Sequence, residues 1–318
     1  GNNTAAQQAW QQGQALDTTE YYSQRARDIL IGRGLFETPT IVNLNPDLVK
    51  ERKDAETWVR ITFKLPEGTD LSGPGTLAQD ARFIRGTELW EMGLYGEARL
   101  EFESLRDSVS TNPADSFRLG NHLLDIGLYR SAIFAIRQVL TLAGQDSQSA
   151  SLTAPPYFNH VRYGLYYHDV IINESQTYGL DPLFMFSVIR QESLFEGFVK
   201  STAGAHGLMQ VIPATGEQIA HELNWPPNYT ALDLSRPNVS ARFGAYYLAK
   251  NRDLLGGNLF ATLAAYNGGP GNALVWNQLA NNDPDLFVEV IRFDETRDYI
   301  RSIYEIFGTY RTIYSPVQ

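Results

Sequence analysis

The chain has 318 residues, 43% of them hydrophobic, a net charge of −10 and no cysteine. This composition excludes disulfides, thiolate nucleophiles and cysteine-ligated metals. The lack of a lysine- or arginine-rich run argues against a nucleic-acid partner held by phosphate contacts. No stretch approaches the roughly twenty unbroken apolar residues of a membrane helix. The length predicts two domains.

The first 75 residues divide into two parts. Residues 1–36 are rich in Gln and Ala and are predicted to be helical. Residues 37–75 contain four prolines and one alternating run, TWVRITFKL. This pattern predicts a connector with one short strand, because alternation favours a strand and proline interrupts regular structure. We therefore expect an N-terminal helix and connector over 1–75.

A repeat follows over residues 76–150. EMGLYGEARLEF begins at Glu91 and DIGLYRSAIFAI begins at Asp125, an offset of 34 residues. This is the period of tetratricopeptide helix pairs, although about three units are needed for a free-standing solenoid. The alternative is two ordinary helical hairpins. The matching positions are two turn glycines and two pairs expected to pack inside: Gly93 and Gly127, Tyr95 with Ala98, and Tyr129 with Ala132.

The polar loop AGQDSQSASLTAPP, residues 143–156, is the best domain boundary, and a second helical domain is expected over 151–318. Asp181 and Pro182 predict the start of a helix through an N-cap and a first-turn proline. Glu192 lies on the apolar face of this helix, with Val188 and Ile189. Phe195 is expected on the same face, since residues three and four apart are neighbours on a helix.

Glu192 is the candidate catalytic residue. Apolar surroundings raise the pKa of a carboxyl group because desolvation disfavours its charged form. Such a group can stay protonated near neutral pH and act as a general acid. The alternative is that Glu192 reaches solvent or pairs with Arg190 or Lys200, because charged side chains are mostly exposed.

Three later stretches offer neutral hydrogen-bonding groups. KSTAGAHGLMQVIPATG (200–216) contains glycines that let the backbone approach a ligand closely. LAAYNGGPGNALVW (263–276) places a tyrosine and an asparagine before a Gly-Pro-Gly turn. FVEVIRFDETRDYI (287–300) adds acidic groups and another tyrosine.

Four of these motifs, taken in order, carry a resemblance: RQES at 190–193, GLMQ at 207–210, AYNGGPG at 265–271 and ETRDYI at 295–300. Together they resemble the catalytic domain of the soluble lytic transglycosylase family, over roughly half the chain. The resemblance implies a lysozyme-like, mainly α-helical catalytic domain that acts on peptidoglycan. The preceding helical region resembles the superhelical domain of this family only in kind. The expected fold class is therefore mainly α, with a tetratricopeptide-like N-terminal region.

The resemblance also implies roles for individual residues. Glu192 matches the catalytic acid/base of the family, and Tyr266 is expected to donate a hydrogen bond to it. Gly268, Gly269 and Arg292 depart from common family residues, but none touches the proposed chemistry. The implied substrate-binding residues are Ser193, Ser201, Gly207, Leu208, Met209, Gln210, Tyr266, Asn267, Glu289, Glu295 and Tyr299.

The residues favour a mechanism with a single acid. A glycosidase with two carboxylates needs a second acid across the cleft, but no Asp or Glu lies between Gly197 and Gln210. Glu196 is expected one turn further along the same helix, where it cannot reach the opposite face of the sugar. The product that the family implies is a 1,6-anhydromuramyl end, formed without water. A hydrolytic muramidase and a non-catalytic glycan-binding scaffold remain the alternatives.

No cofactor and no metal are expected, because no histidine pair has a recognisable ligand spacing with a downstream acid. The five histidines are His122, His160, His168, His206 and His221. The expected partner is the peptidoglycan glycan strand, and the repeats offer a surface for protein partners. We expect a monomer outside the cytoplasm, in the periplasm or cell envelope.

Overall fold

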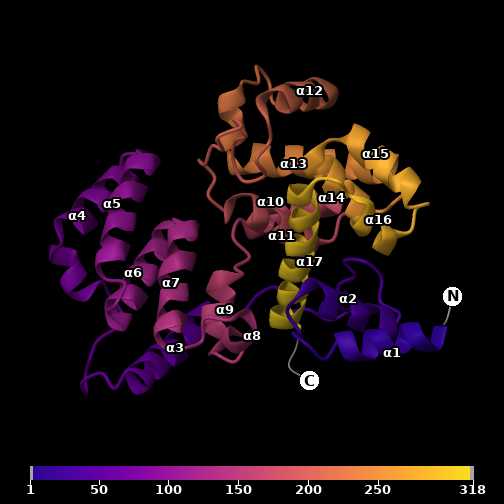
Figure 1. Cartoon of the computed structure of the whole chain (residues 1–318). Coiled ribbons are helices and arrows are strands. Elements are labelled where there is room, and N and C mark those ends of the chain that lie inside the picture. The colour runs from indigo at the N-terminus through magenta and orange to yellow at the C-terminus, as the bar shows by residue number, and fades with distance from the viewer. Residues whose placement is uncertain (1–2, 316–318) are drawn as a thin grey trace. The chain divides into compact units, whose positions relative to one another are not determined.

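The structure is a computed structural model that describes residues 3–315. Within this range it contains seventeen α-helices, two short 3₁₀ helices and no β-strand (Figure 1). The mainly α fold class is thus confirmed. No helix of the described part is long and apolar enough to cross a membrane.

The chain forms two compact units. Unit 1 contains the residues up to Val42, residues 167–193 and the residues from Val199 onward. Unit 2 contains Asn43–Tyr166 together with the short segment Leu194–Phe198. The boundaries expected from the sequence, 1–75, 76–150 and 151–318, stay a prediction about which parts fold independently.

Unit 2 is built from short helices. Its elements are α3 (Leu48–Thr62), the 3₁₀ helix η1 (Gly75–Gln79), α4 (Ala81–Glu91), α5 (Tyr95–Ser108), α6 (Pro113–Ile126), α7 (Tyr129–Leu142), α8 (Gln148–Ser151) and α9 (Pro156–Arg162). We call α4–α7 the helical array. Within it α4 packs against α5, and α6 packs against α7. Both pairs turn at glycines with positive φ, 77° at Gly93 and 88° at Gly127.

The 34-residue repeat also appears in how closely the paired helices approach. A Cβ on Gly86 of α4 would lie 2.9 Å from the Phe102 ring of α5. A Cβ on Gly120 of α6 would lie 2.8 Å from Ile136 of α7. The two glycines are 34 positions apart, and so are the two side chains that pack against them. Sequence reasoning missed these contacts, although the glycines at a repeated offset were a usable signal.

The alanines expected inside the array, Ala98 and Ala132, are both fully buried. The expectation for Tyr95 was wrong, since it is 43% exposed and its ring lies against Phe198 at 5.7 Å. An aromatic residue at the first position of a helix can reach a neighbouring loop rather than the core. The repeat is therefore supported at the small residues and not at this tyrosine.

Leucine at either buried alanine should destabilise unit 2. We expect Ala98→Leu and Ala132→Leu each to lower the free energy of unfolding by about 1–3 kcal/mol, because extra atoms overpack a filled interior. The same change at the exposed Ala81 of α4 is the control. Urea unfolding of the three variants checks this. Equal stability of Ala132→Leu and Ala81→Leu would contradict the packing described.

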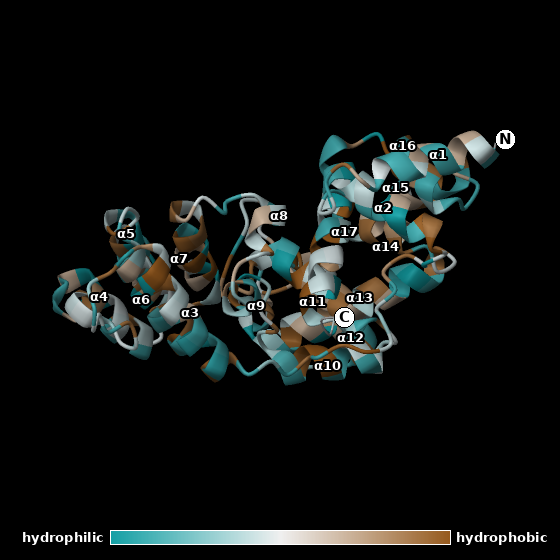
Figure 2. Cartoon of the chain, turned by 90° about the horizontal axis from the view of Figure 1, so that it is seen from below, coloured by the Kyte–Doolittle hydropathy of each residue, from teal (hydrophilic) through white to brown (hydrophobic). Residues whose placement is uncertain are grey.

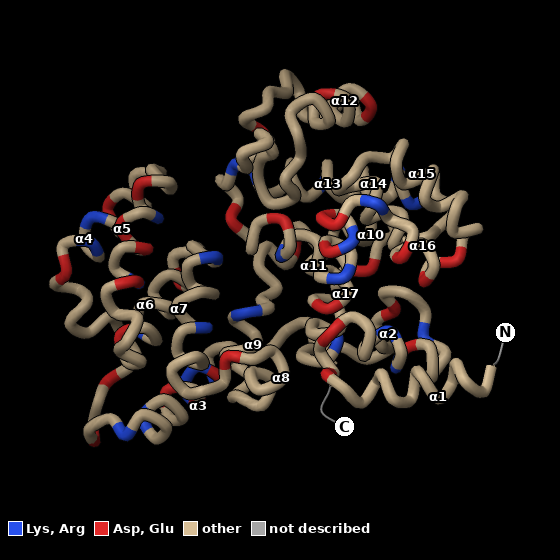
Figure 3. The backbone as a smooth tube through the Cα atoms, in the orientation of Figure 1, with Lys and Arg blue, Asp and Glu red and all other residues tan. Residues whose placement is uncertain are grey.

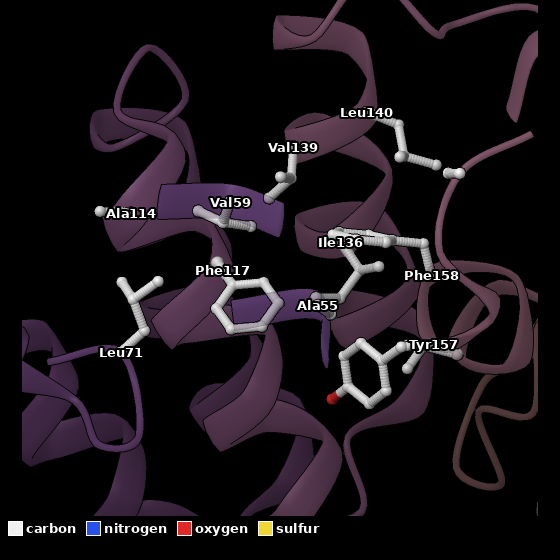
Figure 4. Packing of buried hydrophobic residues seen from close by; sticks show 12 residues of the cluster. Ala55, Val59, Leu71, Ala114, Phe117, Ile136, Val139, Leu140, Tyr157 and Phe158 are labelled. Atoms are coloured by element: carbon white, nitrogen blue, oxygen red, sulfur yellow. The ribbon is translucent and has the colours of Figure 1, made fainter. Parts of the chain in front are cut away.

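The irregular connector expected over residues 37–75 was wrong for its middle part, which is helical. The short strand expected in TWVRITFKL does not form. Leu48–Thr62 forms the fifteen-residue helix α3, whose first turn is capped by the Asp47 side chain accepting from Lys50 N at 3.0 Å. The alternation in TWVRITFKL was outweighed by helical packing of Ala55 and Val59, both fully buried. Figure 4 shows these side chains in one cluster with Phe117 of α6. The period of four between them was the signal to use.

Unit 1 combines helices from both ends of the sequence. Its elements are α1 (Asn3–Gly13), α2 (Tyr21–Leu30), α10 (His168–Thr177), α11 (Pro182–Ser193), α12 (Pro213–Leu223), the 3₁₀ helix η2 (Ala231–Ser235), α13 (Pro237–Leu254), α14 (Leu259–Gly268), α15 (Pro270–Leu279), α16 (Pro284–Val290) and α17 (Asp294–Tyr314). Hydrophobic residues gather on α11 and α14 (Figure 2). Helix α17 packs against both of them.

The N-terminal helices belong to this unit because α2 packs on α17. Asp28 is fully buried and accepts two hydrogen bonds from Arg311, both at 3.0 Å, and one from Tyr304 at 2.6 Å. Phe36 lies in a cluster of rings that includes Phe184 of α11 at 4.9 Å. Buried charge pairing and aromatic packing thus fasten residues near the N-terminus to the helices around Glu192.

Charged residues of both signs are interspersed along the tube in Figure 3. A basic face is the electrostatic footprint of nucleic-acid binding. The fold therefore adds no support for such a partner.

Candidate functional site

Glu192 lies near the C-terminal end of α11. The helix begins as the sequence predicted, because Asp181 Oδ1 accepts from the backbone N of Leu183 at 2.8 Å and of Phe184 at 3.2 Å. Every residue from Leu183 to Ile189 is buried. Glu192 itself is only partly buried, because one side of it faces a cavity. An apolar helix thus carries one acid to the edge of a pocket.

The helix ends earlier than expected. Leu194 and Phe195 have φ values of 50° and 64°, in the left-handed region, so α11 stops at Ser193. Phe195 therefore does not share a helical face with Glu192, and the expected position of Glu196 on the same helix was wrong. Glu196 belongs to unit 2, where it pairs with Arg99 and is absent from the lining of the cavity.

The cavity has a volume of about 480 Å³, within the range of small-molecule sites. Glu192 is the one carboxyl group in its described lining. The remaining polar groups are neutral amides and hydroxyls, which suits a ligand that presents hydroxyl and amide groups. The lining residues are Glu192, Ser201, Ala203, Ala205, Gln210, Val211, Ile212, Thr215, Tyr247, Ala265, Tyr266, Asn267 and Gly269.

The tyrosine that bonds the acid is not the one expected. Tyr299 of α17 donates from its hydroxyl to Glu192 Oε1 at 2.5 Å. Tyr266 of α14 instead donates to the carbonyl oxygen of Met209 at 2.7 Å, so its expected bond to Glu192 was wrong. Tyr266 still lines the cavity beside Glu192. Helix α17 packs against α11, which brings Tyr299 to the acid across more than a hundred residues of sequence.

Burial controls the protonation of the site. Desolvation raises the pKa of Glu192 to about 7, and the hydrogen bond from Tyr299 acts in the opposite direction. Burial, followed by the nearby charge of Glu192, also raises the pKa values of Tyr299 and Tyr266 well above their usual value. Near neutral pH, Glu192 can therefore hold or release a proton while both tyrosines remain neutral donors.

Loss of the Tyr299 hydroxyl should affect the protonation and the orientation of the Glu192 carboxyl group in different ways. We expect Tyr299→Phe to raise the pKa of Glu192 further, because the bond that stabilises the ionised form is removed. An acid must be protonated to act, so the alkaline limb of the pH–rate profile should move to higher pH. The rate should fall at least about tenfold, since a hydrogen bond to a charged group contributes about 1.5–3 kcal/mol.

The comparison for this variant is Tyr266→Phe, assayed over the same pH range. Tyr266 bonds a backbone carbonyl rather than the acid, so its loss should leave the position of the alkaline limb unchanged. A limb that moves to lower pH in Tyr299→Phe would contradict the assignment of Tyr299 as the donor to ionised Glu192.

The loop that carries GLMQ is held by backbone contacts. Gln210 has a φ of 47°. Its side-chain Nε2 donates to the carbonyl of Gly207 at 2.8 Å, so the side chain folds back onto the loop. The backbone N of Met209 donates to Ser240 Oγ at 3.0 Å. The Met209 side chain fills the space over Gly244, where a Cβ would lie 2.4 Å from it. Of the four motif residues, Gln210 lines the cavity and the others support the loop.

Gly207 should tolerate no side chain. Its φ is 77°, and a Cβ would lie 1.9 Å from the carbonyl oxygen of Leu234. We expect Gly207→Ala to destabilise unit 1 by more than the roughly 1–2 kcal/mol of the left-handed conformation alone, because backbone must move. Gly204 is a matched control, with a φ of 79° and open space around its Cβ. Thermal unfolding checks this, and equal losses in Gly204→Ala and Gly207→Ala would contradict it.

The structure brings together only some of the residues that the sequence pointed to. Ser201, Gln210, Tyr266 and Asn267 line the cavity with Glu192, and Tyr299 reaches it through its hydroxyl. Ser193 does not line it, since this buried residue donates to the carbonyl of Ile189 at 3.2 Å. Leu208 and Met209 are fully buried beneath the loop.

The two later acids lie outside the cavity lining. Glu289 is exposed and pairs with Arg301 at 3.3 Å, while also accepting from Tyr22 at 3.1 Å. Glu295 is exposed in the first turn of α17, where a negative charge favours the helix N-terminus. Both positions have a structural explanation within unit 1.

Sequence reasoning missed several residues of the site. Thr215 and Tyr247 line the cavity, and the Tyr247 ring meets Tyr266 edge-on at 5.6 Å. Thr296 donates to Asn267 Oδ1 at 2.7 Å and so orients that amide. Thr296 stands inside the quoted motif ETRDYI, so its position was a usable signal. Thr215 also stands inside a quoted stretch, residues 200–216, whereas Tyr247 lies on α13 outside the quoted stretches.

The described residues contain no group of three or more His, Asp or Glu side chains arranged to hold a metal ion. His206 lies in the loop between Ser201 and Gln210, with its Nδ1 3.3 Å from the carbonyl oxygen of Ala231. His206 thus contacts the backbone at the start of η2.

Comparison with known proteins supplies relatives for this arrangement. The profile of the family described as "Transglycosylase SLT domain" matches residues 169–286. The soluble lytic murein transglycosylase of Escherichia coli is 27% identical over 270 residues, which cover 84% of this chain and 38% of that protein. The chain thus spans well under half the length of this curated relative.

Two solved structures share the fold. The 70-kDa soluble lytic transglycosylase from Escherichia coli superposes with a TM-score of 0.66 at 23% identity, over 98% of this chain and 45% of that chain. A lytic transglycosylase from Pseudomonas aeruginosa, an inactive glutamate-to-glutamine variant, gives 0.62 at 24% identity, over 94% and 42%. At these identities the likeness concerns the fold.

Proposed function

We propose that the chain belongs to the transglycosylase SLT family, whose profile matches residues 169–286, and that it is a peptidoglycan lytic transglycosylase. It would cleave the β-1,4 bond between N-acetylmuramic acid and N-acetylglucosamine and leave a 1,6-anhydromuramyl end. The observation that carries this proposal is Glu192, a single acid with a pKa raised to about 7 in a cavity lined otherwise by neutral groups.

The proposed reaction uses one acid twice. Protonated Glu192 donates its proton to the glycosidic oxygen, and the bond from that oxygen to the anomeric carbon breaks. The acetamido oxygen of the substrate stabilises the anomeric cation, as in substrate-assisted glycosidases. The C6 hydroxyl oxygen then bonds the anomeric carbon, and its proton returns to Glu192. The balance needs no water and no second carboxylate.

The neutral polar groups of the cavity support this substrate class. Glycan strands present hydroxyl and acetamido groups, which Gln210, Tyr266 and Asn267 can bond without a charge. The proposed substrate places the protein outside the cytoplasm, in the periplasm or cell envelope. A monomeric state and protein partners for the array stay predictions.

Release of soluble fragments from purified peptidoglycan tests the proposal against a binding scaffold. The wild-type chain should solubilise glycan material, with Glu192→Gln as the inactive comparison. A scaffold would bind the insoluble glycan and release nothing. Cosedimentation without release by the wild-type chain would therefore replace the enzymatic proposal with the scaffold alternative.

A further inference from the structure

Five residues directly after the helix of Glu192 lie in unit 2. Helix α11 ends at Ser193, Leu194–Phe198 belong to unit 2, and the chain returns to unit 1 at Val199. We call Leu194–Phe198 the crossover segment. It is joined covalently to two parts of the cavity lining, because Glu192 lies just before it and Ser201 follows shortly after it.

The backbone at the start of the crossover segment is strained. Leu194 and Phe195 have φ values of 50° and 64°. Left-handed backbone is unfavourable for residues with a Cβ, and helices usually leave through one glycine in this conformation. Two large residues in succession persist there only when their surroundings hold them, and such strain gathers at functional sites.

Aromatic side chains of unit 2 hold both ends of the crossover segment. Phe195 is 1% exposed and meets the edge of Tyr166 at 5.2 Å. Tyr166 stacks on Tyr129 of α7 at 3.9 Å. At the other end, Phe198 stacks on Tyr95 of α5 at 5.7 Å. This contact accounts for the exposed tyrosine that the repeat did not explain.

A buried acid holds the middle of the segment. The Glu196 side chain is fully buried, and its Oε2 accepts from Arg99 Nη1 at 3.2 Å and from Arg130 Nη1 at 3.3 Å. Its Oε1 has no hydrogen-bond partner in the described part of the chain. A buried carboxylate satisfied at one oxygen is weak evidence for stability. Its definite effect is to fix the segment against α5 and α7.

We propose that the crossover segment, held by Glu196 with Arg99 and Arg130, is a positioning element for Glu192. The segment is joined covalently to the last turn of α11 at one end and to the start of the Ser201 loop at the other. It thereby fixes the backbone two residues after the acid. This inference rests on the proposed function for its effect on rate.

Glu196→Gln tests the inference, with Glu101→Gln as the matched control. Glu101 is on α5 and pairs with Arg85 of α4 at 2.8 Å, away from the crossover segment. We expect Glu196→Gln to lower the single-turnover rate of glycan cleavage at least tenfold. Its melting temperature should fall, because one partner of a buried ion pair is lost, while the chain stays folded at the assay temperature. Its glycan Kd, measured in the Glu192→Gln background, should equal that of wild type. Glu101→Gln should match wild type in all three.

A second readout does not depend on turnover. Carbon NMR of the Glu192 carboxyl group should show its titration moving toward the ordinary range of glutamate in Glu196→Gln, as the acid leaves its buried position. If the wild-type chain cleaves no glycan, the proposed function fails, while this titration still tests positioning. The double variant Arg99→Gln/Arg130→Gln should reproduce both effects, and it replaces Glu196→Gln should that variant fail to fold.

Two results would overturn the inference. One is a Glu196→Gln variant with the wild-type rate and an unmoved Glu192 titration. The other is a rate that falls only together with glycan binding, since this would indicate a purely structural role. A fall in rate with unchanged glycan binding and a moved titration supports positioning.

Discussion

Glu192→Gln should lower the rate of glycan cleavage by at least about 10²–10⁴-fold, the usual contribution of general acid–base catalysis. The loss should lie at the upper end or beyond, because the proposed reaction uses this group first as acid and then as base. Glutamine keeps the shape of the side chain and can accept the Tyr299 hydrogen bond, so the fold and glycan binding should persist. Release of soluble fragments, together with cosedimentation, measures both properties.

The matched control is Glu217→Gln, the same chemical change at an exposed glutamate on α12 of the same unit. It should cleave at the wild-type rate. A Glu192→Gln variant that retains a tenth of wild-type activity would refute the assignment, because the described lining of the cavity offers no second carboxyl group to replace it.

Asp28→Ala should lower the free energy of unfolding of unit 1 by about 3–5 kcal/mol, the usual result of removing one partner of a buried ion pair. Asp28 is fully buried, and the Arg311 side chain that it bonds is 9% exposed. The substitution leaves this guanidinium without its partner and removes the acceptor of the Tyr304 hydroxyl. Hydrogen exchange of α17 peptides in urea reads unit 1 separately from unit 2.

The control for this variant is Asp253→Ala. Asp253 pairs with Arg252 at 2.9 Å, but its side chain is 71% exposed, so the change should cost about 0–1 kcal/mol. If α17 were equally protected from hydrogen exchange in the two variants, Asp28 would not be needed for the packing of α2 on α17.

The parts of the fold that could be predicted from the sequence depend on local signals. Asp181 and Pro182 marked the start of α11, because capping chemistry acts within one turn. The offset of 34 residues between Ala98 and Ala132 indicated the paired helices, because a repeated spacing places corresponding residues at corresponding packing contacts. The strand expected in TWVRITFKL does not form. Val59 of this run lies four positions after Ala55, and both are buried on one face of α3.

The remaining parts depend on contacts between distant residues. Nothing near Asp28 in the sequence indicates Arg311, and only the packing of α2 on α17 brings them together. The positive φ values of Leu194 and Phe195 were equally hidden, because large residues seldom adopt them.

The site shows the same division. The apolar face of α11 was sufficient to single out Glu192 and to predict that burial raises its pKa, and Glu192 proved to be the carboxyl group of the cavity. Its hydrogen-bond donor was assigned to Tyr266 rather than Tyr299, because two nearby tyrosines differ only in the direction of their hydroxyls. Direction follows from the crossing of α14 and α17, which no local pattern records.

If Glu192 cleaves the glycan without water, the mass of the product ends will show it. Purified peptidoglycan is digested by the wild-type chain in water labelled with the heavy oxygen isotope, and the released ends are analysed by mass spectrometry. We expect ends lighter by one water molecule than hydrolysed ends, with no heavy oxygen incorporated. Ends that carry the heavy oxygen would contradict it and identify the protein as a hydrolytic muramidase.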